Sequence, residues 1–296
     1  MKFIFRIPFF LIILIISSCS ENTADSGNNQ TAEYTQIDFE PAFSPDGNII
    51  LYVHSNVNFE YSGIKLKNFI SGADSLIINI NARCPDLSPD LKWIAYSIDN
   101  FIVKSKINGD SLRILRNTGI NFYPKWNSSG EKILFADIDN INLSNKGIWL
   151  MDKNGNDAEL IEQNGGFPEW KGNDNTVVFL KKFTDANGNA LGDTIYEKNL
   201  NTGIKKLIYV LQGDDHRNNS YLNYINGEFI FCSTSNTGYS YIYKISAQGN
   251  LIKLTETQGW SPAVNTGKII YTNRNPGNGR LWEMDISGNN KIQITF

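Results

Sequence analysis

Apolar residues along this chain lie in short runs that recur at a regular spacing. Residues 40–52 read EPAFSPDGNIILY, residues 84–96 read CPDLSPDLKWIAY, and residues 123–135 read YPKWNSSGEKILF. The shared pattern is a proline, an apolar or aromatic residue two positions later, a polar turn and a second apolar run. Further copies, some of them shorter, occupy residues 167–179, 221–231 and 262–271. Since Pro, Asp and Gly favour turns and short apolar runs favour strands, each copy predicts two strands joined by a turn.

Each unit continues with a second pair of short apolar segments, separated by a turn that contains glycine. In the first unit these segments are residues 64–66 and 75–77, and Gly72 lies between them. The corresponding glycines of the other units are Gly109, Gly155, Gly203, Gly249 and Gly288. A glycine-containing turn between two strands is typical of a β-hairpin, so each unit is expected to hold four strands.

The repeats have the period of propeller blades. The proline of each copy, or its equivalent, defines anchor positions at residues 41, 85, 124, 168, 221 and 262. Four strands in roughly 40–50 residues is the period of a propeller blade. We therefore predict an all-β fold, a six-bladed β-propeller of four-stranded antiparallel blades, over residues 33–296.

The first nineteen residues have the pattern of a bacterial lipoprotein signal peptide. Lys2 and Arg6 precede an apolar run over residues 9–16, and the sequence Ile-Ser-Ser-Cys ends at Cys19. A membrane-spanning anchor is the alternative, but this run is shorter than the roughly 20 apolar residues that a spanning helix needs. We predict a signal peptide over residues 1–18 and lipidation of Cys19.

The lipid anchor sets the predicted location of the protein. Residues 19–32 comprise the lipidated cysteine and a polar segment that is expected to act as a flexible tether. Acyl chains on Cys19 would hold the protein on a membrane. Ser20 follows the cysteine, and by resemblance to enterobacterial lipoprotein sorting this favours the outer membrane. The prediction is a cell-envelope protein on the outer membrane that faces the periplasm, with exposure at the cell surface left open.

Composition argues against several other classes of protein. The chain has 296 residues, of which 41% are hydrophobic, and this is enough for a large core. Its net charge of −3 leaves no basic surplus for a nucleic-acid partner. With two histidines, His54 and His216, it cannot supply a metal site built from three histidines. Cys84 and Cys232 either pair as a disulfide or remain as buried free thiols.

The repeats resemble the TolB-like, WD40-like family of β-propellers. Residues 41–52 (PAFSPDGNIILY) carry the resemblance best, and residues 148–152 (IWLMD), 281–285 (LWEMD) and 292–296 (IQITF) support it. The resemblance covers essentially all of residues 33–296 and implies a six-bladed propeller. It is informative about the fold rather than the function, because the matching residues are turn and core residues.

Candidate ligand-binding residues come from the segments where one unit returns to the first strand of the next. In a propeller these segments are expected to border the mouth of the central channel. The sequence Gly-Asp-Asp-His-Arg at residues 213–217 is the densest cluster of mixed charge in the chain. The alternative is that the aromatic residues pack between blades and the charges are solvated. The predicted set is Arg83, Phe122, Tyr123, Phe167, Asp214, Asp215, His216, Arg217 and Trp260.

An insertion in the fourth unit, residues 184–194, is a weak candidate for a calcium site. Its oxygen-bearing side chains alternate along the sequence, as in Asp-rich calcium loops. Ala190 stands where such loops carry glycine, and no glutamate closes the loop, so a polar hairpin tip is the alternative. The candidate ligands are Asp185, Asn187, Asn189 and Asp193. No other cofactor is expected.

Two functions fit the sequence. The first is a non-enzymatic, lipid-anchored envelope propeller that binds a protein or glycan partner through one face. It follows from the lipidation motif and from the lack of a recognisable catalytic set, since Gly-Asp-Ser-Leu at residues 109–112 falls in a predicted hairpin turn. The alternative is a hydrolase or lyase that acts on a polysaccharide, with Asp214, Asp215 and His216 as its polar centre.

Overall fold

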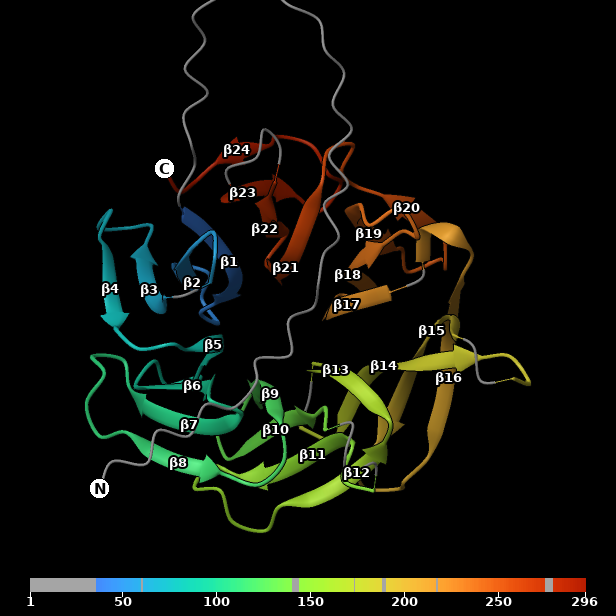
Figure 1. Cartoon of the computed structure of the whole chain (residues 1–296), viewed down its shortest axis with the longest axis horizontal. Coiled ribbons are helices and arrows are strands. Elements are labelled where there is room, and N and C mark those ends of the chain that lie inside the picture. The colour runs from blue at the N-terminus through green and yellow to red at the C-terminus, as the bar shows by residue number, and fades with distance from the viewer. Residues whose placement is uncertain are drawn as a thin grey trace, which may run out of the picture. The chain divides into compact units, whose positions relative to one another are not determined.

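The computed structural model describes residues 36–59, 61–139, 144–172, 174–187, 190–216, 218–274 and 279–296. Regular structure in this part of the chain is β-strand, apart from one 3₁₀ turn, η1 (Asp214–His216). Its strands form six four-stranded antiparallel sheets that follow one another around a ring (Figure 1). The predicted six-bladed β-propeller is therefore confirmed. The predicted signal peptide, Cys19 and the tether lie outside the described residues.

Each blade is a continuous stretch of chain whose strands lie in the sheet in sequence order, beginning with the innermost strand. Blades 1 and 2 consist of β1 (Gln36–Phe43), β2 (Ile49–Asn56), β3 (Ser62–Asn68), β4 (Asp74–Ile78), β5 (Arg83–Leu87), β6 (Trp93–Ile98), β7 (Phe101–Lys106) and β8 (Arg113–Arg116). Blades 3 and 4 consist of β9 (Asn121–Trp126), β10 (Lys132–Asp137), β11 (Gly147–Asp152), β12 (Glu159–Gln163), β13 (Gly165–Trp170), β14 (Thr176–Thr184), β15 (Ala190–Asn199) and β16 (Lys205–Gln212). Blades 5 and 6 consist of β17 (Asn218–Ile225), β18 (Glu228–Thr234), β19 (Ser240–Ile245), β20 (Leu251–Lys253), β21 (Gly259–Asn265), β22 (Lys268–Asn273), β23 (Arg280–Asp285) and β24 (Ile292–Gln293).

Apolar cores lie between the blades. Ile50 and Tyr52 of β2 pack with residues of blade 6, whereas Leu51 of the same strand packs with residues of blade 2. Equivalent clusters of buried side chains occupy the other four junctions between neighbouring blades. Because both faces of a blade are covered, its second strand is a continuous apolar run rather than an alternating one.

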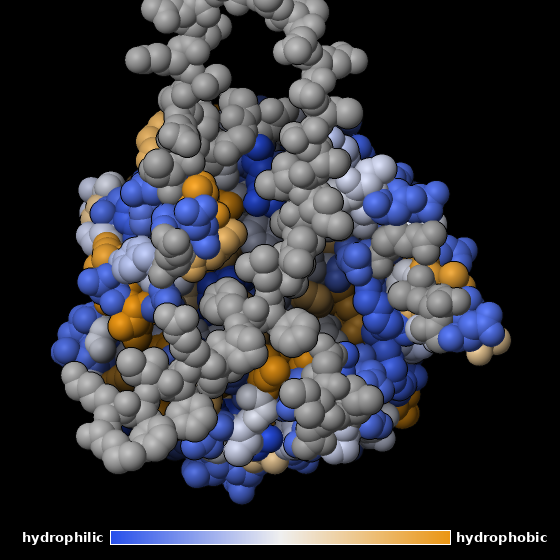
Figure 2. All heavy atoms as spheres, in the orientation of Figure 1, coloured by the Kyte–Doolittle hydropathy of each residue, from blue (hydrophilic) through white to orange (hydrophobic). Residues whose placement is uncertain are grey.

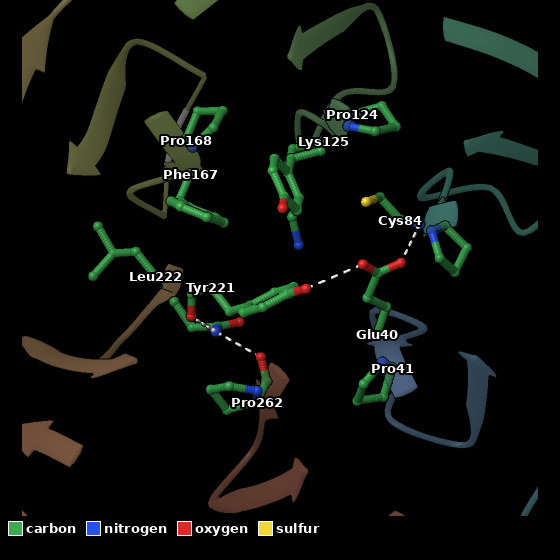
Figure 3. A pocket seen from close by; sticks show the side chains of 13 residues that line it. Glu40, Pro41, Cys84, Pro124, Lys125, Phe167, Pro168, Tyr221, Leu222 and Pro262 are labelled. Atoms are coloured by element: carbon green, nitrogen blue, oxygen red, sulfur yellow. Dashed lines mark hydrogen bonds between the residues drawn. The ribbon is translucent and has the colours of Figure 1, made fainter. Parts of the chain in front are cut away.

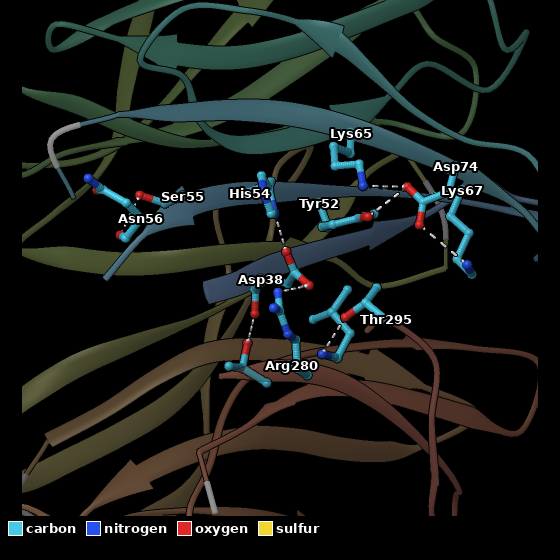
Figure 4. Close-up of polar contacts among 12 residues, drawn as sticks. Asp38, Tyr52, His54, Ser55, Asn56, Lys65, Lys67, Asp74, Arg280 and Thr295 are labelled. Atoms are coloured by element: carbon cyan, nitrogen blue, oxygen red, sulfur yellow. Dashed lines mark hydrogen bonds and ion pairs between the residues drawn. The ribbon is translucent and has the colours of Figure 1, made fainter. Parts of the chain in front are cut away.

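The ring closes without an exchanged strand. β1 pairs with β2 of its own blade, and β24 completes blade 6 beside β23. Polar contacts of Asp38 join the two blades (Figure 4): the Arg280 guanidinium lies 3.2 Å from its carboxylate, and the Thr272 hydroxyl donates to its carbonyl oxygen at 3.0 Å. His54 Nδ1 lies 2.6 Å from the same carboxylate. These side chains and a backbone hydrogen bond from the Asp38 N–H to the Gly279 carbonyl oxygen, at 2.7 Å, thus join blades 1 and 6 without a shared sheet.

A β-bulge interrupts the first strand of every blade at the same place. In blade 1 the register passes from Phe39↔Val53 to Ala42↔Leu51, so two residues, Glu40 and Pro41, oppose one residue of β2. The first bulge residue has left-handed backbone in all six blades, with φ between +44° and +58°. The second is proline in five blades, because a bulge residue need not donate a ladder hydrogen bond. In blade 5 this position is Leu222, so the fifth anchor position is 222 rather than 221.

Candidate functional site

The first bulge residues of blades 1 to 5 converge at the centre of the ring (Figure 3), and that of blade 6, Ser261, accepts a hydrogen bond from the Glu40 N–H. Each lies directly before the second bulge residue, on the innermost strand, where left-handed backbone redirects its side chain. We call this set the axial plug. Its members are Glu40, Cys84, Tyr123, Phe167, Tyr221 and Ser261.

Glu40 is the charged centre of the axial plug. Its side chain is 3% exposed, and its carboxylate accepts two hydrogen bonds from Arg83, at 2.6 and 3.0 Å. The Cys84 backbone N–H and the Tyr221 hydroxyl donate to the same carboxylate at 2.8 and 3.1 Å. The Glu40 N–H in turn donates to the Ser261 hydroxyl at 3.0 Å. Burial opposes ionisation of Glu40, but the charge of Arg83 and these hydrogen bonds hold the pKa of Glu40 below its usual value.

Aromatic rings fill the rest of the axial plug. The ring centroids of Tyr123 and Phe167 lie 4.6 Å apart, and those of Phe167 and Tyr221 lie 5.6 Å apart. Tyr123 and Tyr221 are in edge-to-face contact at 5.7 Å, a favourable geometry for aromatic pairs. Together with the Glu40 network, these rings bring side chains of several blades into contact at the level of the bulges.

A cavity of about 40 Å³ lies against the axial plug. This volume holds roughly three water molecules, so it suits the tip of one side chain rather than a whole small-molecule ligand. Its walls are mainly prolines of the bulges, with Lys125 and Asn223 as polar side chains beyond the plug. Both amide hydrogens of Asn223 are used, by the carbonyl oxygens of Tyr221 and Pro262 at 2.8 and 2.9 Å. The proline walls are Pro41, Pro85, Pro124, Pro168 and Pro262.

Lys125 lies between two carboxylates of neighbouring blades. Its Nζ is 3.8 Å from Asp86 of blade 2 and 3.4 Å from Glu169 of blade 4. Burial raises the pKa of Asp86 to about 7, although Lys125 and the Trp126 N–H, which donates at 2.7 Å, oppose the shift. Burial would lower the pKa of Lys125, but the charges of Glu169 and Asp86 outweigh it and raise that pKa. The cavity is therefore lined by a lysine that stays cationic, and Asp86, which titrates near neutrality, lies beside that lysine rather than in the cavity wall.

The structure places part of the predicted binding set at the axis. Tyr123 and Phe167 belong to the axial plug, and Arg83 is bound to Glu40. Phe122 lies next to Tyr123, at a centroid distance of 6.1 Å. Trp260 is one residue before the plug, where its ring stacks on Phe39 at 5.5 Å.

The remaining predicted residues lie elsewhere. Asp214, Asp215 and His216 form η1, which lies against β16 and β18. His216 is buried, its Nδ1 lies 2.9 Å from the Ser233 hydroxyl, and its ring is edge-on to Tyr243. Burial lowers the pKa of His216, with the charge of Asp215 opposing the shift, so the ring is neutral at neutral pH. Arg217 lies outside the described residues.

The candidate calcium ligands are spread along the β14–β15 hairpin. Asp193 is buried, and it accepts from Lys182 Nζ at 3.1 Å and from the Asn219 side chain at 2.9 Å. Asp185 accepts from the backbone N–H of Asn187 at the hairpin tip. Asn189 lies outside the described residues. Within the described ranges, no group of three or more His, Cys, Asp or Glu side chains could hold a metal ion.

Seven site residues were missed by the sequence analysis, namely Glu40, Cys84, Tyr221, Ser261, Asp86, Lys125 and Glu169. A signal for the first four was present, because each precedes an anchor position of the corrected repeat. Reading the residue before the anchor in every copy would have selected Cys84 instead of Arg83 and Tyr221 instead of residues 214–217. Asp86, Lys125 and Glu169 each directly follow an anchor position and could have been found in the same way.

Comparison with models of known protein families finds no match, and neither does comparison with curated protein sequences. Many solved structures do share the fold. A protein described as TolB from Agrobacterium tumefaciens has a TM-score of 0.64 at 17% identity, with 79% of this chain and 88% of that chain covered. A chain of a nidogen/laminin complex has a TM-score of 0.55 at 16% identity, with 73% and 79% covered.

A third similar structure is an oligogalacturonate lyase in complex with manganese, with a TM-score of 0.57 at 9% identity and 84% and 90% of the two chains covered. At these identities the likenesses show a shared fold, that of TolB proteins and other six-bladed propellers. Separately, no helix among the described residues has the length and apolar character to cross a membrane.

Proposed function

We propose that this chain is a non-enzymatic propeller of the cell envelope, lipid-anchored through Cys19, that binds a protein partner through one face. The observation that carries the proposal is the axial plug with its small proline-walled cavity. A cavity of this size accepts the end of one side chain of a partner, whereas turnover of a polysaccharide needs an extended cleft around two or more polar catalytic groups. The docking face is the one at which the first strand of each blade ends, after its bulge.

Two further observations support a binding role. The axial plug contains three aromatic rings, and Arg83 binds its Glu40; aromatic residues and arginine are enriched where proteins bind one another. Figure 2 shows hydrophilic and hydrophobic residues side by side on one face of the molecule. Non-obligate interfaces have a similarly mixed character. The nidogen/laminin complex shows that a similar fold occurs in a protein–protein assembly.

Site-specific photo-crosslinking tests this proposal. A photoreactive amino acid in place of Lys92, in the β5–β6 turn, lies on the proposed docking face, and the Lys92 side chain is well exposed. The matched control replaces Tyr239 in the β18–β19 turn, which lies at the opposite ends of the strands and is also exposed. We expect one defined envelope protein to be crosslinked from position 92 and none from position 239. Equal crosslinking from both positions, or none from either, would contradict the proposed docking face.

A further inference from the structure

Three lysine side chains of blade 4 converge on one carboxylate of blade 3. Lys181 and Lys205 each donate a hydrogen bond of 2.9 Å to Oε1 of Glu162, and Lys198 Nζ lies 3.5 Å from Oε2. Glu162 belongs to β12, the outermost strand of blade 3, and the lysines belong to β14, β15 and β16 (Figure 1). We call these four residues the lysine cluster. It is separate from the axial plug and from the cavity.

The lysine cluster has more positive than negative charge. Burial opposes ionisation of Glu162, but hydrogen bonds from Lys205 and Lys181, together with their charges, hold the pKa of this carboxyl below its usual value. Glu162 therefore supplies one full negative charge at neutral pH. The structure pairs none of the three lysines with a second carboxylate among its described residues. An excess of two positive charges remains.

This arrangement is unfavourable by itself. Lys198 and Lys205 are direct partners in the register of β15 and β16, and like charges directly opposite each other destabilise a sheet. The three ammonium groups make three contacts with Glu162 and one with the carbonyl oxygen of Ile161. Since each ammonium carries three N–H donors, more than half of the donors are left for solvent or for a ligand.

The lysine side chains are partly exposed to solvent, whereas the carboxylate is buried. The side chains of Lys181, Lys198 and Lys205 are 30%, 21% and 37% exposed, whereas Glu162 is 7% exposed. A ligand approaching from outside therefore meets N–H donors first. The carboxylate holds the three side chains together, so their positions are set before a ligand arrives.

We infer that the lysine cluster is a binding site for the dianionic phosphate group of a phosphate monoester. A phosphate monoester presents three acceptor oxygens and a charge of about −1.5 to −2 at neutral pH. Three ammonium groups match the oxygens in number, and the dianion cancels the excess charge of the cluster. A carboxylate ligand has one negative charge and would leave half of that excess. Charge-assisted hydrogen bonds of this kind are stronger than those between neutral groups.

Thermal unfolding of the full chain in inorganic phosphate tests the site. A ligand that binds the folded state raises the unfolding midpoint as its concentration rises. Ionic strength is held constant with sodium chloride, so that a general effect of salt is not mistaken for binding. We expect Lys198→Met and Lys205→Met each to weaken phosphate binding by roughly tenfold, the effect of losing one charge-assisted contact. The control is Lys206→Met, which removes the same charge from the neighbouring position on the opposite face of β16.

The results separate the source of the phosphate and can overturn the inference. Glucose 1-phosphate stands for soluble phosphate esters, and vesicles that contain phosphatidic acid stand for lipid headgroups, with phosphatidylcholine vesicles as their control. Binding of either probe that is lost in Lys198→Met and kept in Lys206→Met supports the site and identifies the source. No midpoint shift beyond that of sodium chloride, or equal losses in Lys198→Met and Lys206→Met, would overturn it.

Discussion

Replacing Glu40 by glutamine tests whether the axial plug holds the ring together. The change keeps the size of the side chain and one acceptor oxygen, but it removes the charge that faces Arg83. Four hydrogen bonds from Arg83, Cys84 and Tyr221 converge on the native carboxylate. Glutamine can accept some of these and must turn an N–H₂ group toward another donor.

The expected loss follows from the geometry of this pair. Breaking a buried ion pair by removal of one partner costs about 3–5 kcal/mol. The Arg83 side chain is 35% exposed, so water can solvate part of its charge and the lower end applies, about 3 kcal/mol. For a domain of this size that corresponds to a fall of roughly 6–12 °C in the unfolding midpoint.

Chemical denaturation at neutral pH measures this loss, and two controls define it. Glu131→Gln removes an exposed carboxylate paired with Lys153 at 2.8 Å and should cost less than about 0.5 kcal/mol. In an Arg83→Met background the cost of Glu40→Gln should fall by about 2 kcal/mol, because the paired charge is gone. Because the folded pKa of Glu40 is lowered, its contribution is present above the unfolded value, about 4.3, and is lost as pH falls through the folded pKa. A loss below about 1 kcal/mol, or one unchanged by Arg83→Met, would refute this account.

Three further predictions concern other buried groups. Asp86→Asn should stabilise the protein at pH 8 by roughly 2–4 kcal/mol and have little effect below pH 4. The reason is that the pKa of Asp86 in the folded protein, about 7, exceeds its unfolded value, so the native protein loses stability as pH rises through 7. Equal denaturation curves of the two proteins at pH 8 would contradict this prediction. Asp38→Asn should cost about 2–3 kcal/mol and speed amide exchange in β1 and β21, because it weakens the contact with Arg280 that joins blades 1 and 6; unchanged exchange in both strands would argue against this role. In a chain with Cys19→Ser, Cys84 and Cys232 should react with a thiol reagent at the rate of unfolding, since both are free and buried and burial raises the pKa of each thiol; rapid reaction of the native protein would contradict their burial.

Much of the fold could be predicted because its rules are local. Turn residues, apolar runs and the six hairpin glycines recur in each unit, and the glycines have positive φ in the structure, as at Gly72 with +75°. The repeated proline was visible, but its role in a bulge was not, because a bulge is defined by pairing with the neighbouring strand. The fifth anchor was misplaced by one residue for the same reason, since leucine replaces proline there.

The candidate site was harder to predict, because its residues lie on six different blades. The Glu40–Arg83 pair joins residues 43 positions apart, and Tyr221 reaches the same carboxylate from 181 positions away. No local pattern in the sequence indicates such a contact. The dense charge cluster at residues 213–217 was therefore predicted as part of the site instead. In the structure Asp215 and His216 of that cluster contact Ser233 of blade 5, away from the axis.

The two residues of each bulge are subject to different constraints, one from folding and one from the proposed recognition of a partner. Its second position is almost always proline, so the fold restricts that residue strongly. Its first position has the same left-handed backbone in every blade, yet it carries six side chains that include an acid, a thiol, two phenols, a phenyl ring and a hydroxyl. Non-glycine residues rarely adopt this backbone, and each instance costs about 1–3 kcal/mol. A fold that needed only the backbone would place glycine at all six positions. The side chains retained there at that cost therefore act at the axis, where five of them line the cavity that we propose receives the partner.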